Sequence, residues 1–177
     1  MPDHKTHDQL GLGAAALLIP GSYAALHYGL GAAPAAAYSG MLLVVGSHLW
    51  ATWMLSPDLD INSAIYDRWG PLRWLWLPYQ VFTPHRSWFS HSGISGALRL
   101  VYLALAVWLA LAALWWAGEQ IPGIDDLPHY HTTFWRWLTS SVQAGAWPAA
   151  LIVAGVVIAD LVHVAADLVT SEIKGWW

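Results

Sequence analysis

The sequence contains no cysteine and few charged residues. Its 177 residues include 7 Lys and Arg and 11 Asp and Glu, so charged residues make up 10% of the chain. A typical soluble domain has about 25%. The absence of cysteine excludes disulfides, thiolate nucleophiles and cysteine-ligated zinc or iron–sulfur centres. The basic residues are scattered and form no run, so we expect no nucleic acid partner.

Apolar and aromatic residues take the place of the missing charges. Hydrophobic residues make up 57% of the chain, and 14 residues are Trp, which concentrates at membrane–water interfaces. The length fits one domain. The composition therefore predicts a single membrane domain over residues 1–177.

The uncharged intervals give the expected spans. Residues 9–57 contain no Asp, Glu, Lys or Arg. This interval is too long for one helix, because a span needs about 20 residues, and Gly31 and Pro34 mark a break. We predict an all-α, polytopic fold with a long interfacial cytoplasmic loop at 57–98. About four transmembrane helices are expected, near residues 11–31, 36–56, 99–118 and 148–170.

The basic residues predict the orientation. Most of them lie before the first span, in or beside the 57–98 loop, or after the last span, and only Arg136 lies on the other side. Because cytoplasmic loops carry the excess of Lys and Arg, we expect both termini and the 57–98 loop in the cytoplasm. The predicted location is the bacterial inner membrane.

The last predicted span carries three ionisable residues. Asp160, His163 and Asp167 fall within an arc of about 60° on a helix. Ionisable side chains inside a span are costly and usually face protein or water in a functional role. The stripe therefore indicates a polar site rather than a lipid-facing surface.

The two ends of the 57–98 loop supply matching side chains. Asp58 and Asp60 follow the second predicted span, and His85 and His91 precede the third. Each pair is a weak signal alone. Both pairs, and the end of the last span, lie on the same side of the predicted membrane, and carboxylates and imidazoles are ligands of zinc, manganese and non-haem iron. We therefore expect a metal site there.

The order of these motifs resembles an uncharacterised bacterial family of predicted metal-binding membrane proteins. More remotely, the chain is similar to YdjM-like inner-membrane metal-dependent hydrolases. The resemblance covers nearly the whole chain apart from about 118–146. The matching segments are KTHD (5–8), SPDLD (56–60), the segment 68–80, HRSWFSH (85–91) and HVAAD (163–167). This resemblance implies a set of metal ligands: His7, Asp58, Asp60, His85, His91, His163 and Asp167.

The sequence departs from the family pattern at three positions. Ser92 stands where the family more often has Gly, and His48 and Asp160 have no counterpart in the pattern. His48 lies ten residues before Asp58, about 15 Å deeper at the rise of a helix, and is expected not to share the metal.

The ligand count leaves the number of ions open at one or two. A bridging carboxylate, Asp58 or Asp60, would suit a two-metal site, while some candidates would instead orient ligand imidazoles. The residues most suited to that orienting role are Asp167, Asp8 and Asp160. The expected cofactor is a divalent ion, one or two of zinc, manganese or iron.

Arg86 and Asp167 are the predicted catalytic residues. A guanidinium beside His85 can bind a phosphate through two hydrogen bonds. The alternative is an arginine that contacts lipid headgroups without specificity, and the sequence does not decide between the two.

Two aromatic segments are assigned to the membrane surface. Residues 68–82 mix Trp and Arg without acids, which suits the headgroup layer. Residues 127–138, with His129 and His131, are expected to form an aromatic belt on the opposite side.

These features support two hypotheses for function. The first is a metal-dependent hydrolase that acts on a lipid-soluble phosphoester or ester at the cytoplasmic face, with membrane lipid and an anionic lipid-like substrate as partners. The second is a non-catalytic, metal-stabilised subunit or assembly factor that packs against a membrane protein or another copy of itself. Transport is less favoured, because the ligands gather at one face rather than along a path.

Overall fold

All regular elements in the described part of the chain are helices, as the sequence predicts. The computed structural model describes residues 4–85, 87–121, 128–143 and 145–174. The elements are α1 (His4–Ala24), η1 (Ala25–Gly29), α2 (Pro34–Met54), η2 (Pro57–Asp60), α3 (Ala64–Arg68), η3 (Gly70–Trp76), α4 (Leu77–Phe82), α5 (Trp88–His91), α6 (Ser95–Glu119), α7 (Tyr130–Gln143) and α8 (Ala146–Lys174).

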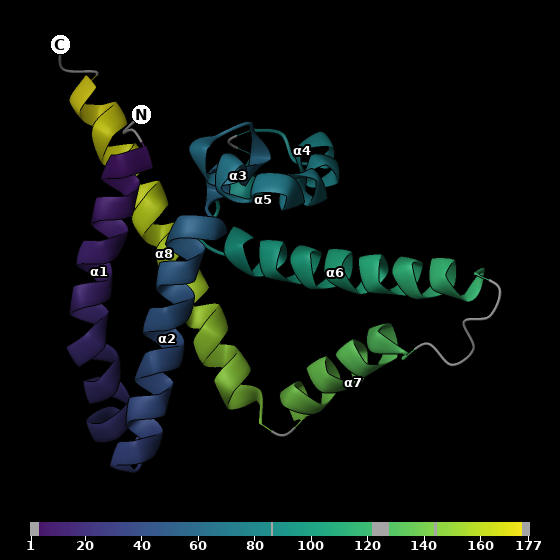
Figure 1. The fold of residues 1–177 in the computed structure, drawn as a ribbon. Helices are drawn as coiled ribbons and strands as arrows, with labels where there is room; N and C mark the ends of the chain where they lie inside the picture. The colour runs from purple at the N-terminus through teal and green to yellow at the C-terminus, as the bar shows by residue number, and fades with distance from the viewer. Residues whose placement is uncertain (1–3, 86, 122–127, 144, 175–177) are drawn as a thin grey trace.

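Helices α1, α2 and α8 lie side by side and form a bundle (Figure 1). The turn between α1 and α2 uses Gly31 at φ 70° and Pro34 at the start of α2, where a proline N–H would have no helical partner. His27 Nδ1 donates a hydrogen bond at 2.8 Å to the Ala32 carbonyl oxygen inside this turn. His27 therefore closes the turn locally.

Glycines allow the bundle helices to approach closely. A Cβ built on Gly155 of α8 would lie 2.3 Å from the Val44 carbonyl oxygen of α2. A Cβ on Gly11 of α1 would lie 2.3 Å from the side chain of Thr52. Small residues at helix contacts are typical of membrane bundles, where close backbone packing drives association.

The prediction of four spans is not confirmed. Helices long and apolar enough to cross a membrane are found at His4–Gly29, Ser95–Glu119 and Ala146–Thr170, while α2 is not among them. Helix α6 also leaves the bundle sideways, and α7 lies below it in the view of Figure 1. The bundle in the described part of the chain therefore consists of α1, α2 and α8.

Residues 57–85 and 87–91 fold into a cap at the end of the bundle where α1 begins and α8 ends (Figure 1). Its core contains Trp76, which is fully buried and contacts Trp69, Tyr79 and Tyr102 edge-on or tilted. The sequence predicted that this segment lies in the headgroup layer, and that placement stays a prediction. Within the segment, Trp76 packs inside the cap, whereas Trp74 is exposed.

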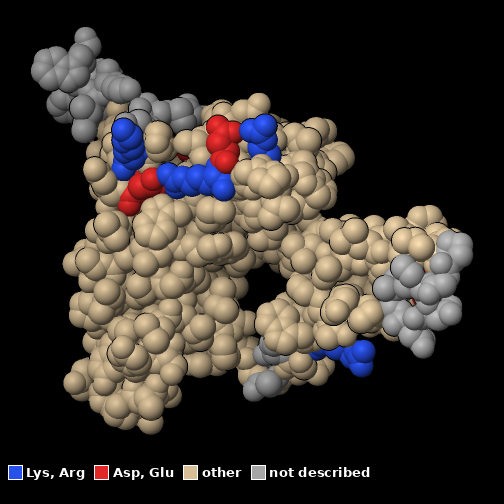
Figure 2. Space-filling view, viewed as in Figure 1, with Lys and Arg blue, Asp and Glu red and all other residues tan. Residues whose placement is uncertain are grey.

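Charged side chains gather over the cap end of the molecule, above a large uncharged surface (Figure 2). Two ion pairs lie there, Asp8 with Arg68 and Asp67 with Arg73. The charged residues in this view therefore lie mainly at the cap end, and the surface of the helices below it is largely uncharged.

Replacing Gly155 with alanine should loosen the contact between α2 and α8. The added methyl group meets backbone atoms that cannot rotate away, and overpacking of this kind costs about 1–3 kcal/mol. We expect a lower Tm for G155A in detergent. The control is G46A on α2, because nothing lies within 4 Å of a Cβ at Gly46. Equal Tm values for the two variants would contradict the close packing.

Candidate metal centre

The structure brings the seven predicted ligands together from distant segments. His7 lies on α1, and Asp58 and Asp60 lie in η2. His85 precedes α5, and His91 is the last residue of α5. His163 and Asp167 lie on α8. They form overlapping groups whose ligand atoms lie within 4.8 Å of one another. The groups are His7, His163 and Asp167; Asp58, His91 and His163; and Asp60, His85 and His91.

The group of Asp58, His91 and His163, called the central group below, joins the cap to α8. Asp58 Oδ1 lies 4.0 Å from His91 Nε2 and 3.7 Å from His163 Nε2. All three atoms are buried, and none has a hydrogen-bond partner among the described residues. Buried polar atoms normally have a partner, so each exception needs an explanation. Three such atoms facing one another fit a bound cation.

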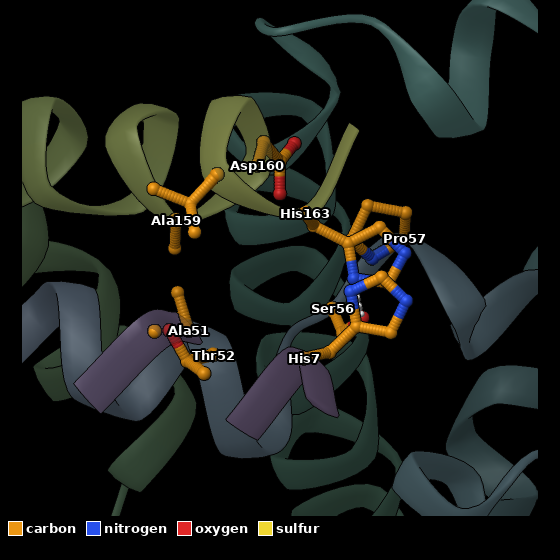
Figure 3. Close-up of a pocket in the computed structure, with 10 residues that line it drawn as sticks. His7, Ala51, Thr52, Ser56, Pro57, Ala159, Asp160 and His163 are labelled. Atoms are coloured by element: carbon orange, nitrogen blue, oxygen red, sulfur yellow. Dashed lines mark hydrogen bonds between the residues drawn. The ribbon is translucent and has the colours of Figure 1, made fainter. Parts of the chain in front are cut away.

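His7 and Asp167 flank the central group. The rings of His7 and His163 stack with centroids 3.9 Å apart and lie face to face in Figure 3. Asp167 Oδ1 lies 3.3 Å from His7 Nε2, and its Oδ2 lies 3.7 Å from His163 Nε2. The start of α1 is therefore part of the site, because α1 begins at His4 rather than near residue 11 as predicted.

Asp60 and His85 form the other flank. The Nδ1 of His85 lies 2.9 Å from Asp60 Oδ1, and the Nδ1 of His91 lies 3.7 Å from Asp60 Oδ2. The Asp60 side chain is buried, whereas His85 is 34% exposed. A carboxylate that binds one ring nitrogen orients the other, so Asp60 directs His85 while that histidine stays reachable from outside.

Serine hydroxyls contact the other nitrogen of two central imidazoles. Ser56 Oγ lies 3.3 Å from His163 Nδ1, and Ser90 Oγ lies 2.9 Å from His91 Nδ1. Both serines are buried. These contacts leave Nε2 of each ring facing Asp58.

Burial and the neighbouring charges favour the forms that bind metal. Burial would raise the pKa of Asp58, but the attraction of His163, and then of His7 and His91, brings that pKa below its ordinary value. Burial lowers the pKa of His91. A carboxylate and a neutral imidazole are the species that coordinate metal.

The donor set is therefore suited to a divalent ion. Imidazole nitrogens with carboxylate oxygens, and no thiolate, suit zinc, manganese or iron. The geometry also fits such an ion, because the buried atoms of Asp58, His91 and His163 that face one another lack a hydrogen-bond partner among the described residues.

Asp160 does not belong to any of these groups. It forms a buried ion pair with Arg99 of α6 and accepts a hydrogen bond from Ser95 Oγ at 2.8 Å. The sequence analysis placed Asp160 in one polar stripe with His163 and missed Arg99 as its partner. The sequence does contain a sign of this pair. Arg99 stands at the edge of one uncharged run, and Asp160 is an acidic residue inside another.

Other candidates lie outside the cluster or outside the described residues. Asp8 pairs with Arg68, and His48 Nε2 lies 2.9 Å from the Gly11 carbonyl oxygen. Arg86, the predicted anion-binding residue, lies outside the described residues, so its role stays a prediction.

His129 and His131 lie beside Trp115 at the opposite end of α6, away from the cap. The ring centroids of the two histidines are 4.8 and 4.7 Å from that of Trp115. Neither histidine belongs to a ligand group among the described residues.

A small cavity lies beside the histidine stack. It is lined by residues of α1, α2 and α8 and by Ser56 and Pro57, with His7, His163 and Asp160 at its polar part (Figure 3). Its volume of about 10 Å³ is at the lower limit of what one water molecule needs. The cavity is therefore too small for a substrate.

Comparison with known proteins gives a family and one relative. A chain from Aquifex aeolicus (strain VF5), named "Uncharacterized protein", is 32% identical over 136 residues, which cover 72% of this chain and 89% of that protein. No solved structure matches the chain. The family described as "Uncharacterized metal-binding protein (DUF2227)" matches residues 2–177. Because the match covers almost the whole sequence, the chain belongs to this family of metal-binding proteins.

Proposed function

We propose that this protein is a membrane-embedded, metal-dependent hydrolase with its site at the cytoplasmic end of the bundle. The observation that carries the metal part is the set of buried atoms without a hydrogen-bond partner, Asp58 Oδ1, His91 Nε2 and His163 Nε2. Three helices long and apolar enough to cross a membrane support the location.

The ion proposed is divalent, held by the central group with Asp167 and His7 beside it. When bound, such an ion supplies Lewis-acid polarisation of a carbonyl or phosphoryl oxygen and activates water. We propose one ion as the minimum, since the central group alone has three converging donors.

The chain's own residues would bind and orient the substrate. Asp167 offers a carboxylate 15% exposed, and we propose that it accepts a proton as a general base, with His7 Nε2 3.3 Å from its Oδ1. General bases of this kind must lie within reach of the proton that they take. Arg86 would hold the anionic group of the substrate.

The substrate proposed is a phosphoester or ester with a lipid chain. Charged side chains gather at the cap end, above an uncharged surface (Figure 2), so the site lies where the polar and apolar surfaces meet. A molecule with a polar head and an apolar tail fits that boundary, and YdjM-like hydrolases provide the remote analogy.

A metal-stabilised subunit is the second candidate. Helix α6 is long and apolar, yet only 6% of its most hydrophobic window is buried within the chain. Such a surface suits lipid or a partner helix equally well. In this case the ion would stabilise the cap on the bundle without turnover.

Metal content tests the site directly. We expect protein purified without chelator to hold zinc, manganese or iron near or above one ion per chain, measured by mass spectrometry. Asp58→Asn should lose most of that metal, because an amide oxygen carries no charge to hold a cation. Asp67→Asn is the matched control, since Asp67 lies in an exposed ion pair with Arg73. Well-folded, metal-free wild-type protein would contradict the metal proposal.

Turnover separates the enzyme from the subunit. We expect metal-loaded protein in mixed micelles to hydrolyse a lipid-chained phosphoester or ester, and His163→Ala to reduce kcat/KM at least ~100-fold, a loss typical of removed catalytic machinery. The Asp67→Asn variant should retain activity. Metal-loaded wild type without turnover on either substrate class, but with a Tm that falls when chelator is added, would instead favour the subunit.

A further inference from the structure

Arg99 is a fully buried arginine outside the ligand groups. It lies in the first turns of α6, is 0% exposed, and its Nη2 donates to Asp160 Oδ1 on α8, a residue 1% exposed. A buried ion pair is tolerated only when its remaining N–H groups and lone pairs are also satisfied. The other hydrogen bonds of Arg99 therefore show what the guanidinium holds in place.

Those hydrogen bonds reach two further segments. Arg99 Nε donates to the Leu55 carbonyl oxygen at 2.8 Å, and its Nη1 donates to the Ser90 carbonyl oxygen and to Ser95 Oγ, both at 3.1 Å. Leu55 follows α2, and Ser90 lies in α5. One side chain thus joins the end of α2, the short helix α5, α6 and α8.

Both carbonyl groups stand beside the serines of the metal centre. The Leu55 carbonyl forms the peptide bond to Ser56, whose Oγ lies 3.3 Å from His163 Nδ1. The second carbonyl belongs to Ser90 itself, whose Oγ lies 2.9 Å from His91 Nδ1. Arg99 therefore fixes the backbone at both positions from which a hydroxyl reaches a central imidazole.

The other contacts of Ser90 favour one direction for this hydrogen bond. The carbonyl oxygens of Ser87 and Pro84 lie 3.2 and 3.4 Å from its Oγ and can accept from its hydroxyl, which leaves a lone pair to accept from His91 Nδ1–H. A neutral imidazole with its proton on Nδ1 presents a lone pair at Nε2. That is the buried atom that faces Asp58.

Ser56 orients the other central imidazole. Its Oγ accepts from the Asp58 backbone N–H at 3.5 Å, so it also fixes the start of η2, where Asp58 lies. Its contact with His163 Nδ1 at 3.3 Å leaves Nε2 of that ring facing Asp58.

We propose that Arg99 is a positioning residue for the metal site, acting through the backbone of Leu55 and Ser90. Its guanidinium holds the two serine hydroxyls in place. These hydroxyls orient the rings of His163 and His91, and Ser90 also selects the Nδ1–H form of His91. The inference rests on the metal site proposed above and adds a part of the chain that the ligand groups do not contain.

Lysine cannot replace Arg99 in this role. The guanidinium is a planar fork whose N–H groups point in several fixed directions, whereas the ammonium of lysine is a single point at the end of a flexible stem. Two carbonyls, a hydroxyl and a carboxylate on four segments therefore require arginine.

Ser90→Ala is the first test, because it removes one hydroxyl and keeps the charge pair. The full-length protein in nanodiscs is stripped of metal and titrated with Co²⁺, with the visible absorption of bound Co²⁺ as the signature. We expect affinity to fall 10–100-fold, the usual effect of losing a group that orients a ligand, with a changed absorption spectrum. Ser39→Ala is the matched control, because Ser39 is exposed on α2 and binds only its own helix at Ala35.

Arg99→Lys tests the role of Arg99 directly, in the same Co²⁺ titration. We expect a loss of Co²⁺ affinity of at least the same size and a changed spectrum. In the Ser90→Ala background the substitution should cost less than it does in the wild type, because residues that act through one another are not additive. The Tm of each metal-free protein separates loss of affinity from loss of fold.

The outcomes distinguish this inference from the metal site. Wild type that binds Co²⁺ while Ser90→Ala and Arg99→Lys bind it with the same affinity and spectrum overturns the inference and leaves the site. Wild type that binds no Co²⁺ overturns both. If Arg99→Lys fails to fold, Ser90→Ala decides alone, and wild-type affinity in that variant overturns the proposal.

Discussion

The buried pair of Arg99 and Asp160 is the interaction on which the cap end of the molecule depends. Removing one partner of such a pair leaves an uncompensated buried charge, at a cost of about 3–5 kcal/mol. The pair fixes where α6 leaves α8, and the other N–H groups of Arg99 tie the end of α2 and α5 to the same point. The need to satisfy every polar group of this buried pair therefore determines how the cap packs on the bundle.

The metal centre depends on this arrangement because its side chains come from segments with no local connection. His163 and Asp167 come from α8, whereas His7 comes from α1. The position of α1 is set in turn by His48, whose Nε2 lies 2.9 Å from the Gly11 carbonyl oxygen one helical turn beyond His7. The group of Asp58, His91 and His163 is complete only when the cap packs on α8, so ion binding at that group is coupled to folding.

The sequence predicted the positions of the helices along the chain and the candidate site residues. It predicted less well how the helices are arranged in space. Long uncharged runs located α2, α6 and α8 within a few residues, and the spacing of motifs identified side chains that the structure gathers. The same runs could not reveal that α6 leaves the bundle sideways, because hydropathy reports composition and not direction. Nor could they pair Arg99 with Asp160 or place Trp76 inside the cap, since both depend on contacts between distant segments.

The serine contacts bear on how many ions the centre can hold. His163 belongs to two ligand groups through Nε2, because Ser56 lies against its Nδ1. The His91 nitrogen that lies 3.7 Å from Asp60 is Nδ1, which Ser90 already contacts. Separate ions in neighbouring groups would therefore compete for one nitrogen or displace a serine. The arrangement favours one ion among Asp58, His91 and His163, with Asp60 orienting His85 from the side.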